Sequence, residues 1–260
     1  MLEASRHHPR QSGELIRFVF TSSLAVYGGP LPEVVTSSTI ATPEGSYGMG
    51  KLVAELLVNE YTRREFVDGV CLRLPTIVVR PGVPSAATSA FISGIIREPL
   101  HGEPAICPVG DSLDSPELSL SAWVASPETT VANFVIAKHV PADKFLKHTR
   151  TVYLPGFTTT VKQELEALAE VAGQDALKLI TFKVGCQVVQ RYGGVAALIS
   201  RMTRLTDVLS VHGLPSLITT THAVLGSSKT KEAWCPLFEG SKRPSRLVLL
   251  DLGLGRCLGA

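Results

Sequence analysis

Residues 15–23 read LIRFVFTSS, a short apolar run that ends in hydroxyl side chains. β-Branched and aromatic residues without polar alternation are typical of a strand that is buried on both faces of a parallel sheet. Thr21, Ser22 and Ser23 would then lie at the carboxyl end of this strand, the edge at which ligands bind in open α/β sheets. The run therefore predicts an α/β fold with a ligand site near the serines.

The residues that follow predict a strand–helix–strand unit. Residues 28–45 are rich in Pro, Ser, Thr and Gly, which predicts a surface loop. Residues 47–66 predict a helix with one apolar side, formed by Val53, Leu56, Leu57 and Tyr61. Residues 70–79 (VCLRLPTIVV) predict the next buried strand, which Pro75 ends or bends. Two such strands are expected to be parallel and joined by a right-handed crossover.

Further along the chain, two helices have clear start signals. Ser126 is a candidate N-cap before Pro127, and this helix is expected to run to about Val140. Thr160-x-x-Gln163 predicts a capping box, and Gly173 suits the end of the helix that follows. Three shorter segments are predicted as a helix over residues 87–96, a surface excursion over 109–121 and a strand over 151–154.

Composition bounds the class of protein. The 260 residues are 45% hydrophobic and 18% charged, as expected for one large or two small globular domains. A net charge of +2 gives no reason to expect nucleic acid or an anionic membrane as a partner. We also expect no membrane span and no structural zinc. The cysteines are odd in number and lack C-x-x-C spacing, which favours a reduced, cytoplasmic protein: Cys71, Cys107, Cys186, Cys235 and Cys257.

Tyr47 and Lys51 lie four residues apart on the predicted helix. This spacing puts both side chains on one face, one helical turn apart. An ammonium near a phenol favours the phenolate, which can exchange a proton with a substrate hydroxyl. Ser23, at the end of the preceding strand, could hold that hydroxyl in line. A Tyr-x-x-x-Lys pair without such a serine would more simply be a surface lysine beside a half-buried tyrosine.

Three runs resemble the extended short-chain dehydrogenases/reductases, the NAD-dependent epimerase/dehydratase family: FVFTSSLAVYGG (18–29), SYGMGK (46–51) and LRLPTIVVRPG (72–82). These enzymes pair a serine-rich strand end with a Tyr-x-x-x-Lys helix. The resemblance extends over residues 1–183. It implies a partial Rossmann-like parallel sheet with helices on both faces, together with a small substrate-binding lobe.

The resemblance also implies roles for individual residues. Ser23, Tyr47 and Lys51 would be catalytic, and Ser23 lies 24 positions before Tyr47, as is typical of the group. The cofactor, NAD with NADP as an alternative, would contact Ser22, Tyr47, Lys51, Leu74 and Pro75. Ser23 and Arg97 would bind the substrate, since a guanidinium suits a carboxylate. Arg97 could instead be a solvated cation at a helix end.

Within the family, the runs RLPTIVVRPG (73–82) and SGIIREPLHGE (93–103) are most similar to D-erythronate dehydrogenases. This implies oxidation of a secondary hydroxyl of a small sugar acid. Family members often dimerise through helices like that over 47–66, so a homodimer is a further expectation. Two alternatives stay open, a nucleotide-sugar epimerase and a catalytically inactive remnant.

The sequence departs from the family at both ends. The family's first strand leads into a G-x-x-G-x-x-G turn that holds the cofactor pyrophosphate, whereas residues 1–22 contain one glycine, Gly13. Residues 184–260 do not resemble the family's final helices. We therefore expect an N-terminally truncated dehydrogenase, with residues 1–183 as a partial domain and residues 184–260 as an unassigned tail that is a candidate for disorder.

Overall fold

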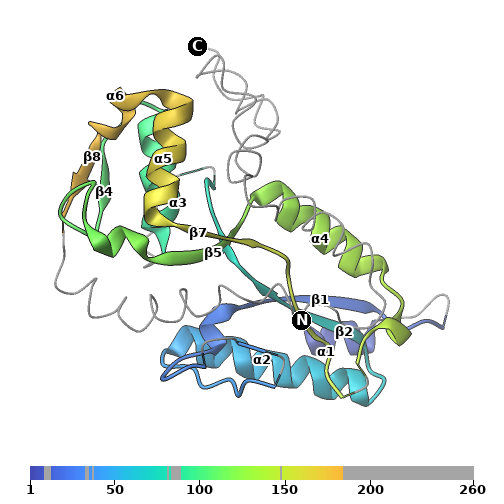
Figure 1. Cartoon of the computed structure of the whole chain (residues 1–260). Helices are drawn as coiled ribbons and strands as arrows, with labels where there is room; N and C mark the ends of the chain where they lie inside the picture. The colour runs from blue at the N-terminus through green and yellow to red at the C-terminus, as the bar shows by residue number, and fades with distance from the viewer. Residues whose placement is uncertain are drawn as a thin grey trace, which may run out of the picture. The chain divides into compact units, whose positions relative to one another are not determined.

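A computed structural model describes residues 1–8, 13–32, 35–36, 38–80, 82, 89–146 and 148–183. These residues divide between two compact units, whose elements are labelled in Figure 1. The first unit holds Met1–Ile77 and Ala122–Thr158, and the second holds Val78–Ser121 and residues 159–183. The expected tail, residues 184–260, lies outside the described residues.

The first unit is built on a parallel sheet in the order β1 (Arg17–Ser23), β2 (Asp68–Leu74) and β6 (Thr151–Tyr153). The predicted parallel α/β arrangement is thus confirmed. β1 begins two residues after the start of the apolar run and continues through the hydroxyl residues, so that Ser23 is its last residue. The register pairs Ser23 with Leu74.

Helices cover both faces of this sheet, as expected. Alternate residues of a strand point to opposite faces. On one face Val70 and Leu72 pack in a cluster with Ala137 of α4 (Pro127–His139). On the other face α2 (Ser46–Arg63) lies so close that a Cβ at Gly69 would come within 2.6 Å of Val58. Figure 1 shows α2 and α4 on opposite sides of β1 and β2.

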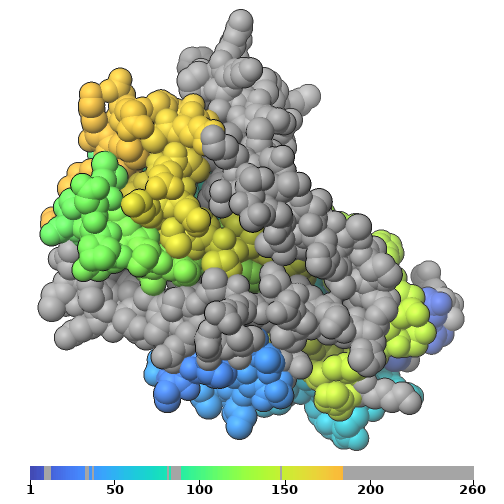
Figure 2. Space-filling view, viewed as in Figure 1, coloured from blue at the N-terminus to red at the C-terminus, as the bar shows by residue number. Residues whose placement is uncertain are grey.

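Much of the apolar side that the sequence indicates for α2 is exposed. Val53, Leu56 and Leu57 are 48%, 61% and 47% exposed, so the apolar side of this helix does not face the sheet. The side that does face the sheet buries Gly48, Glu55 and Val58. Glu55 can lie inside the unit because Arg73 of β2 forms an ion pair with it. Figure 2 shows part of the blue N-terminal segment that includes α2 at the surface.

Pro75 interrupts the second strand, as expected. Proline has no N–H for the ladder, so β2 stops just before it. β3 (Thr76–Ile77) then pairs in parallel with β5 (Ser121–Ala125) in a separate small sheet, of which β7 (Phe157–Thr160) is the third strand. Three short helical segments belong to the first unit: α1 (Leu2–His7), η1 (Leu24–Val26) and η3 (Ala142–Lys144).

The second unit contains α3 (Ala90–Leu100), η2 (Pro116–Ser119), α5 (Val161–Ala172), α6 (Gln174–Leu177) and the parallel pair of β4 (Ala105–Cys107) and β8 (Ile180–Phe182). The predicted capping box of α5 is confirmed, because the Thr160 hydroxyl accepts from the Gln163 N–H at 3.1 Å and the Gln163 side chain accepts from the Thr160 N–H at 2.9 Å. No helix in the described part of the chain is long and apolar enough to cross a membrane.

Candidate active site

Ser23 lies where β1 turns into η1. Its Oγ accepts a hydrogen bond from the Ala25 N–H at 3.1 Å and so caps the short helix. This contact uses the acceptor capacity of the hydroxyl and leaves its proton to be donated elsewhere. The side chain is half-buried and lies opposite Leu74 in the β ladder. The strand end therefore holds a fixed hydroxyl, as the sequence predicts.

Tyr47 and Lys51 share one face of α2. The Lys51 ammonium lies 5.5 Å from the centroid of the Tyr47 ring and 5.1 Å from that of Phe20. The same ammonium donates to the Thr21 carbonyl at 2.7 Å. Lys51 therefore ties the helix to the strand that ends in Ser23, while the Tyr47 ring, 63% exposed, remains open to a ligand.

Gly48 lets the first turn of α2 approach the end of β1. A Cβ at this position would overlap the carbonyl oxygen of Ala25. Any larger residue would therefore push the Tyr47–Lys51 turn away from the Ser23–Ala25 segment. Gly48 is not among the residues predicted for the site, although a glycine between the tyrosine and the lysine of such a helix is a visible signal of close approach.

Ser22 has different surroundings from Ser23. It is 2% exposed, and its hydroxyl donates to the carboxylate of Glu55. The same carboxylate forms a buried ion pair with Arg73 of β2, through two hydrogen bonds of 2.9 and 2.6 Å. The hydroxyl of Ser22 is thus occupied inside the protein, and any contact with a cofactor would fall to its backbone.

Two tyrosines extend the buried pair. Nη1 of Arg73 donates to the hydroxyls of Tyr27 at 2.5 Å and of Tyr153 at 3.1 Å, and these hydroxyls bond to each other. Burial raises the pKa of Tyr27, and the neighbouring Tyr153 adds to the effect. Burial alone would lower the pKa of Arg73, but its bond to Glu55 and the nearby tyrosines raise it. This network was not predicted from the sequence, where its one visible signal is an arginine inside the apolar run VCLRL.

The remaining predicted site residues lie in both units. Leu74 is half-buried at the end of β2, and Pro75 beside it is buried. Arg97 lies in the second unit, in the last turn of α3, where it donates to the Arg80 carbonyl at 2.9 Å and pairs with Glu98. Its side chain is 12% exposed, so the alternative of a solvated helix-end cation is wrong.

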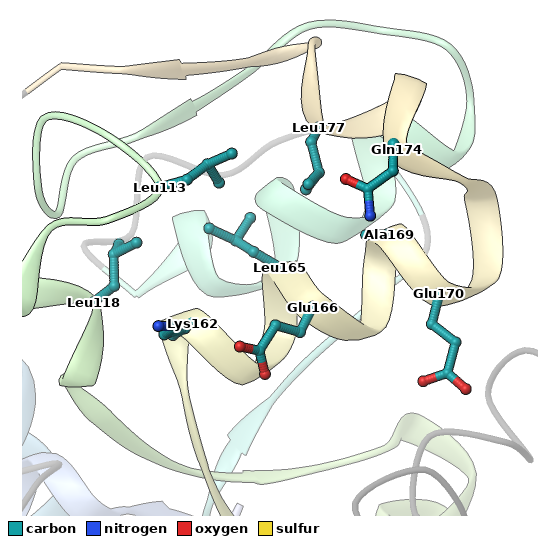
Figure 3. Close-up of a pocket in the computed structure, with 9 residues that line it drawn as sticks. All are labelled: Leu113, Leu118, Lys162, Leu165, Glu166, Ala169, Glu170, Gln174 and Leu177. Carbon is teal, nitrogen blue, oxygen red and sulfur yellow. The ribbon is translucent and has the colours of Figure 1, made fainter.

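A cavity of about 500 Å³ opens in the second unit (Figure 3). Leucines from four segments line its apolar part, while Lys162 and Glu166 of α5 stand at its polar side. None of the predicted site residues lines it. A second hollow, of about 540 Å³, lies in the loop before α2 and is lined by prolines, Leu31, Ile40 and hydroxyl side chains that include Thr36, Ser38, Thr39 and Thr42.

Comparisons with known proteins place this site in context. Residues 1–116 match the model of the NAD dependent epimerase/dehydratase family. Over 174 residues the chain is 49% identical to D-erythronate dehydrogenase of Haemophilus influenzae, covering 67% of this chain and 53% of that protein. It is 48% identical over 174 residues to D-erythronate dehydrogenase of Cupriavidus necator, covering 67% and 51%. The chain spans about half the length of these curated relatives.

A solved structure agrees with the fold. The nucleoside-diphosphate-sugar epimerase from Agrobacterium tumefaciens superposes with a TM-score of 0.67 at 38% sequence identity, covering 78% of this chain and 58% of that one. The matched residues 1–116 include the serine-ended strand, the Tyr47–Lys51 helix and the strand that ends at Leu74. Residues 1–116 thus match the NAD dependent epimerase/dehydratase family, and the similarity to the D-erythronate dehydrogenases and to this epimerase agrees with that match.

Proposed function

We propose that the chain is part of an NAD(P)-dependent oxidoreductase that oxidises a secondary hydroxyl of a small sugar acid such as D-erythronate. One observation carries this proposal. The Lys51 ammonium lies 5.5 Å from the Tyr47 ring centroid and donates to a carbonyl of the strand that ends in Ser23. The naming of two curated relatives as D-erythronate dehydrogenases supports the choice of substrate.

In the proposed reaction, Tyr47 is the general base. Tyr47 would act as the exposed phenolate, whose negative charge the nearby Lys51 cation stabilises. The phenolate oxygen takes the proton of the substrate hydroxyl and becomes a phenol. Ser23 donates its proton to the substrate oxygen and holds it beside Tyr47. A nicotinamide cofactor held by Tyr47 and Lys51 would supply the hydride acceptor for the carbon that bears this hydroxyl.

The described residues suit the nicotinamide end of the cofactor. Lys51 and Tyr47 offer polar groups for its ribose, and Leu74 with Pro75 offers an apolar wall beside Ser23. Ser22 would contribute its backbone, since its hydroxyl bonds to Glu55. We propose NAD as the cofactor, with NADP as the alternative. The two differ at the adenosine ribose, whereas the residues named above would contact the nicotinamide end.

We assign the substrate carboxylate to Arg97. Its guanidinium is held in place by the Arg80 carbonyl and by Glu98, and a guanidinium recognises a carboxylate through two parallel hydrogen bonds. A second candidate function is nucleotide-sugar epimerisation, which the named activity of the Agrobacterium tumefaciens relative favours. A dehydrogenase accumulates reduced cofactor during turnover, whereas an epimerase leaves the cofactor pool unchanged.

Substitution of Tyr47 tests the dehydrogenase. With D-erythronate and a high concentration of NAD⁺, we expect Tyr47→Phe to lower the rate of NADH formation by about 100-fold or more, because the general base is lost. Tyr61→Phe is the matched control, since Tyr61 lies on the same helix and its hydroxyl bonds to Glu3. Equal rates for Tyr47→Phe and Tyr61→Phe would contradict the role of Tyr47.

We also propose a cytoplasmic homodimer. Met49, Val53, Leu56 and Leu57 form an exposed apolar stripe along α2, which a symmetric partner would bury. The free, buried thiols of Cys71 and Cys107 suit a reducing compartment. Sedimentation equilibrium should give the mass of a dimer, and Leu56→Glu should shift it to that of a monomer. A monomeric unsubstituted chain would contradict this part of the proposal.

A further inference from the structure

We infer that Glu55 and Arg73 are the positioning residues of the proposed active site. This inference rests on the proposed function. Glu55, Ser22 and Arg73 are each close in sequence to a predicted site residue. Glu55 lies one helical turn after Lys51, and Ser22 and Arg73 directly precede Ser23 and Leu74.

The Glu55 carboxylate joins three elements at one point. It accepts from Nε and Nη2 of Arg73 on β2, at 2.9 and 2.6 Å, and from the Ser22 hydroxyl on β1. Ser22 and Arg73 are themselves partners in the β1–β2 ladder. One carboxylate on α2 therefore fixes the helix against the ends of both strands. Figure 1 shows β1 and β2 running alongside α2.

The position of Glu55 controls where Lys51 points. The direction in which a side chain leaves an α-helix is set by the rotation of the helix about its axis. A rotation of α2 would therefore carry Lys51 away from the Thr21 carbonyl, to which it donates at 2.7 Å. Glu55 and Lys51 are four residues apart and lie on the same side. The Glu55 clamp thus sets the rotation of the helix at which Lys51 reaches both β1 and the Tyr47 ring.

A role in stability alone is a poorer explanation of this ion pair. Glu55 is 2% and Arg73 9% exposed, so both charges are removed from water. Replacing a buried ion pair with apolar residues of similar volume is often neutral or stabilising. Apolar side chains would not fix the orientation of α2 relative to the two strands. The bidentate Arg73–Glu55 contact, with a third hydrogen bond from Ser22, holds the helix in one orientation.

The test uses a double substitution, Glu55→Leu with Arg73→Met, in the full chain. The readout is acylation of Lys51 by an acetyl N-hydroxysuccinimide ester, followed by mass spectrometry, with the exposed Lys138 as internal reference. We expect Lys51 acylation to rise by about tenfold, as a charge-assisted hydrogen bond is lost. Turnover should fall by about 100-fold, with the KM for the sugar acid little changed.

Two further variants keep the test decisive. The single variant Glu55→Gln retains an acceptor of the same size, so its Lys51 acylation should stay near the rate of the unsubstituted chain. If the double variant does not fold, Ser22→Ala removes one bond of the clamp and should raise acylation by about threefold. Unchanged Lys51 acylation in a folded double variant or in Ser22→Ala would overturn the inference, with or without turnover. Absence of turnover in the unsubstituted chain overturns the proposed function instead.

Discussion

Glu164 is a buried carboxyl group without a hydrogen-bond partner. This residue of α5 has no exposed surface, and neither of its carboxylate oxygens has a hydrogen-bond partner among the described residues. Burial without a partner penalises the charged form and raises the pKa of Glu164 well above its ordinary value of 4.5. In contrast, Glu55 is equally buried but meets three donors. The difference between these two glutamates is one of partners, not of burial.

The raised pKa of Glu164 predicts a pH dependence of stability. Above pH 4.5 the unfolded chain has lost this proton while the folded protein still holds it, so the free energy of unfolding should fall as the pH rises towards the folded pKa. Glu164→Leu should raise the free energy of unfolding near neutral pH by about 1–3 kcal/mol, because no unpaired carboxyl is then buried.

Urea unfolding across a pH series measures both effects. Glu164→Gln should flatten the pH slope, whereas Glu166→Gln, at an exposed position on the same helix, should leave it unchanged. A slope that is the same in Glu164→Gln as in the unsubstituted protein would show that another group is responsible.

At the scale of elements, the contact between α2 and η1 depends on Gly48. Gly48→Ala would set a methyl group against the Ala25 carbonyl and should lower the free energy of unfolding by about 1–3 kcal/mol. Gly50→Ala is the matched control, since a Cβ there would meet nothing within 4 Å. It should instead stabilise the helix by up to about 1 kcal/mol. Thermal unfolding of the two variants decides the matter, and equal shifts would contradict the close packing of α2 on η1.

The sequence predicted those elements whose signals are local. The Ser126 cap and the Thr160–Gln163 box each lie within one helical turn, and both helices begin where these residues indicate. The orientation of α2 could not be predicted in the same way. The helix hides Glu55 and exposes Leu56 because an arginine from another element neutralises the carboxylate, and periodicity within one helix carries no information about such a partner.

In the candidate site, too, the local features could be predicted from the sequence and the contacts between elements could not. Tyr47 and Lys51 lie on one face because their spacing matches a helical turn, and this much is visible in the sequence. Ser22 and Ser23 are adjacent and chemically identical, yet one is sealed against Glu55 and the other caps η1. The alternation of a strand sends them to opposite sides, and only the packed helix decides which side is buried.

At the scale of the whole molecule, the residues proposed for catalysis contrast with the segment that precedes them. Ser23, Tyr47 and Lys51, for which we propose a role in proton transfer, lie within the described first unit, where we infer that the buried Arg73–Glu55 pair sets their positions. The residues before Ser23, by contrast, contain one glycine, Gly13, where the family uses a glycine-rich turn against the cofactor pyrophosphate.

This contrast predicts weak cofactor binding. In a polypeptide limited to residues 1–260, in which residues 1–22 offer no glycine-rich turn for the pyrophosphate, binding would depend on the contacts to the nicotinamide end, and we expect a Kd for NADH on the order of 1 mM. Lys51→Ala should weaken binding only slightly further, since little affinity remains to be lost. Isothermal titration calorimetry with NADH, and with NADPH for comparison, measures both quantities. Micromolar binding that Lys51→Ala abolishes would show that the described residues, with those beyond Lys183, form a complete dinucleotide site after all.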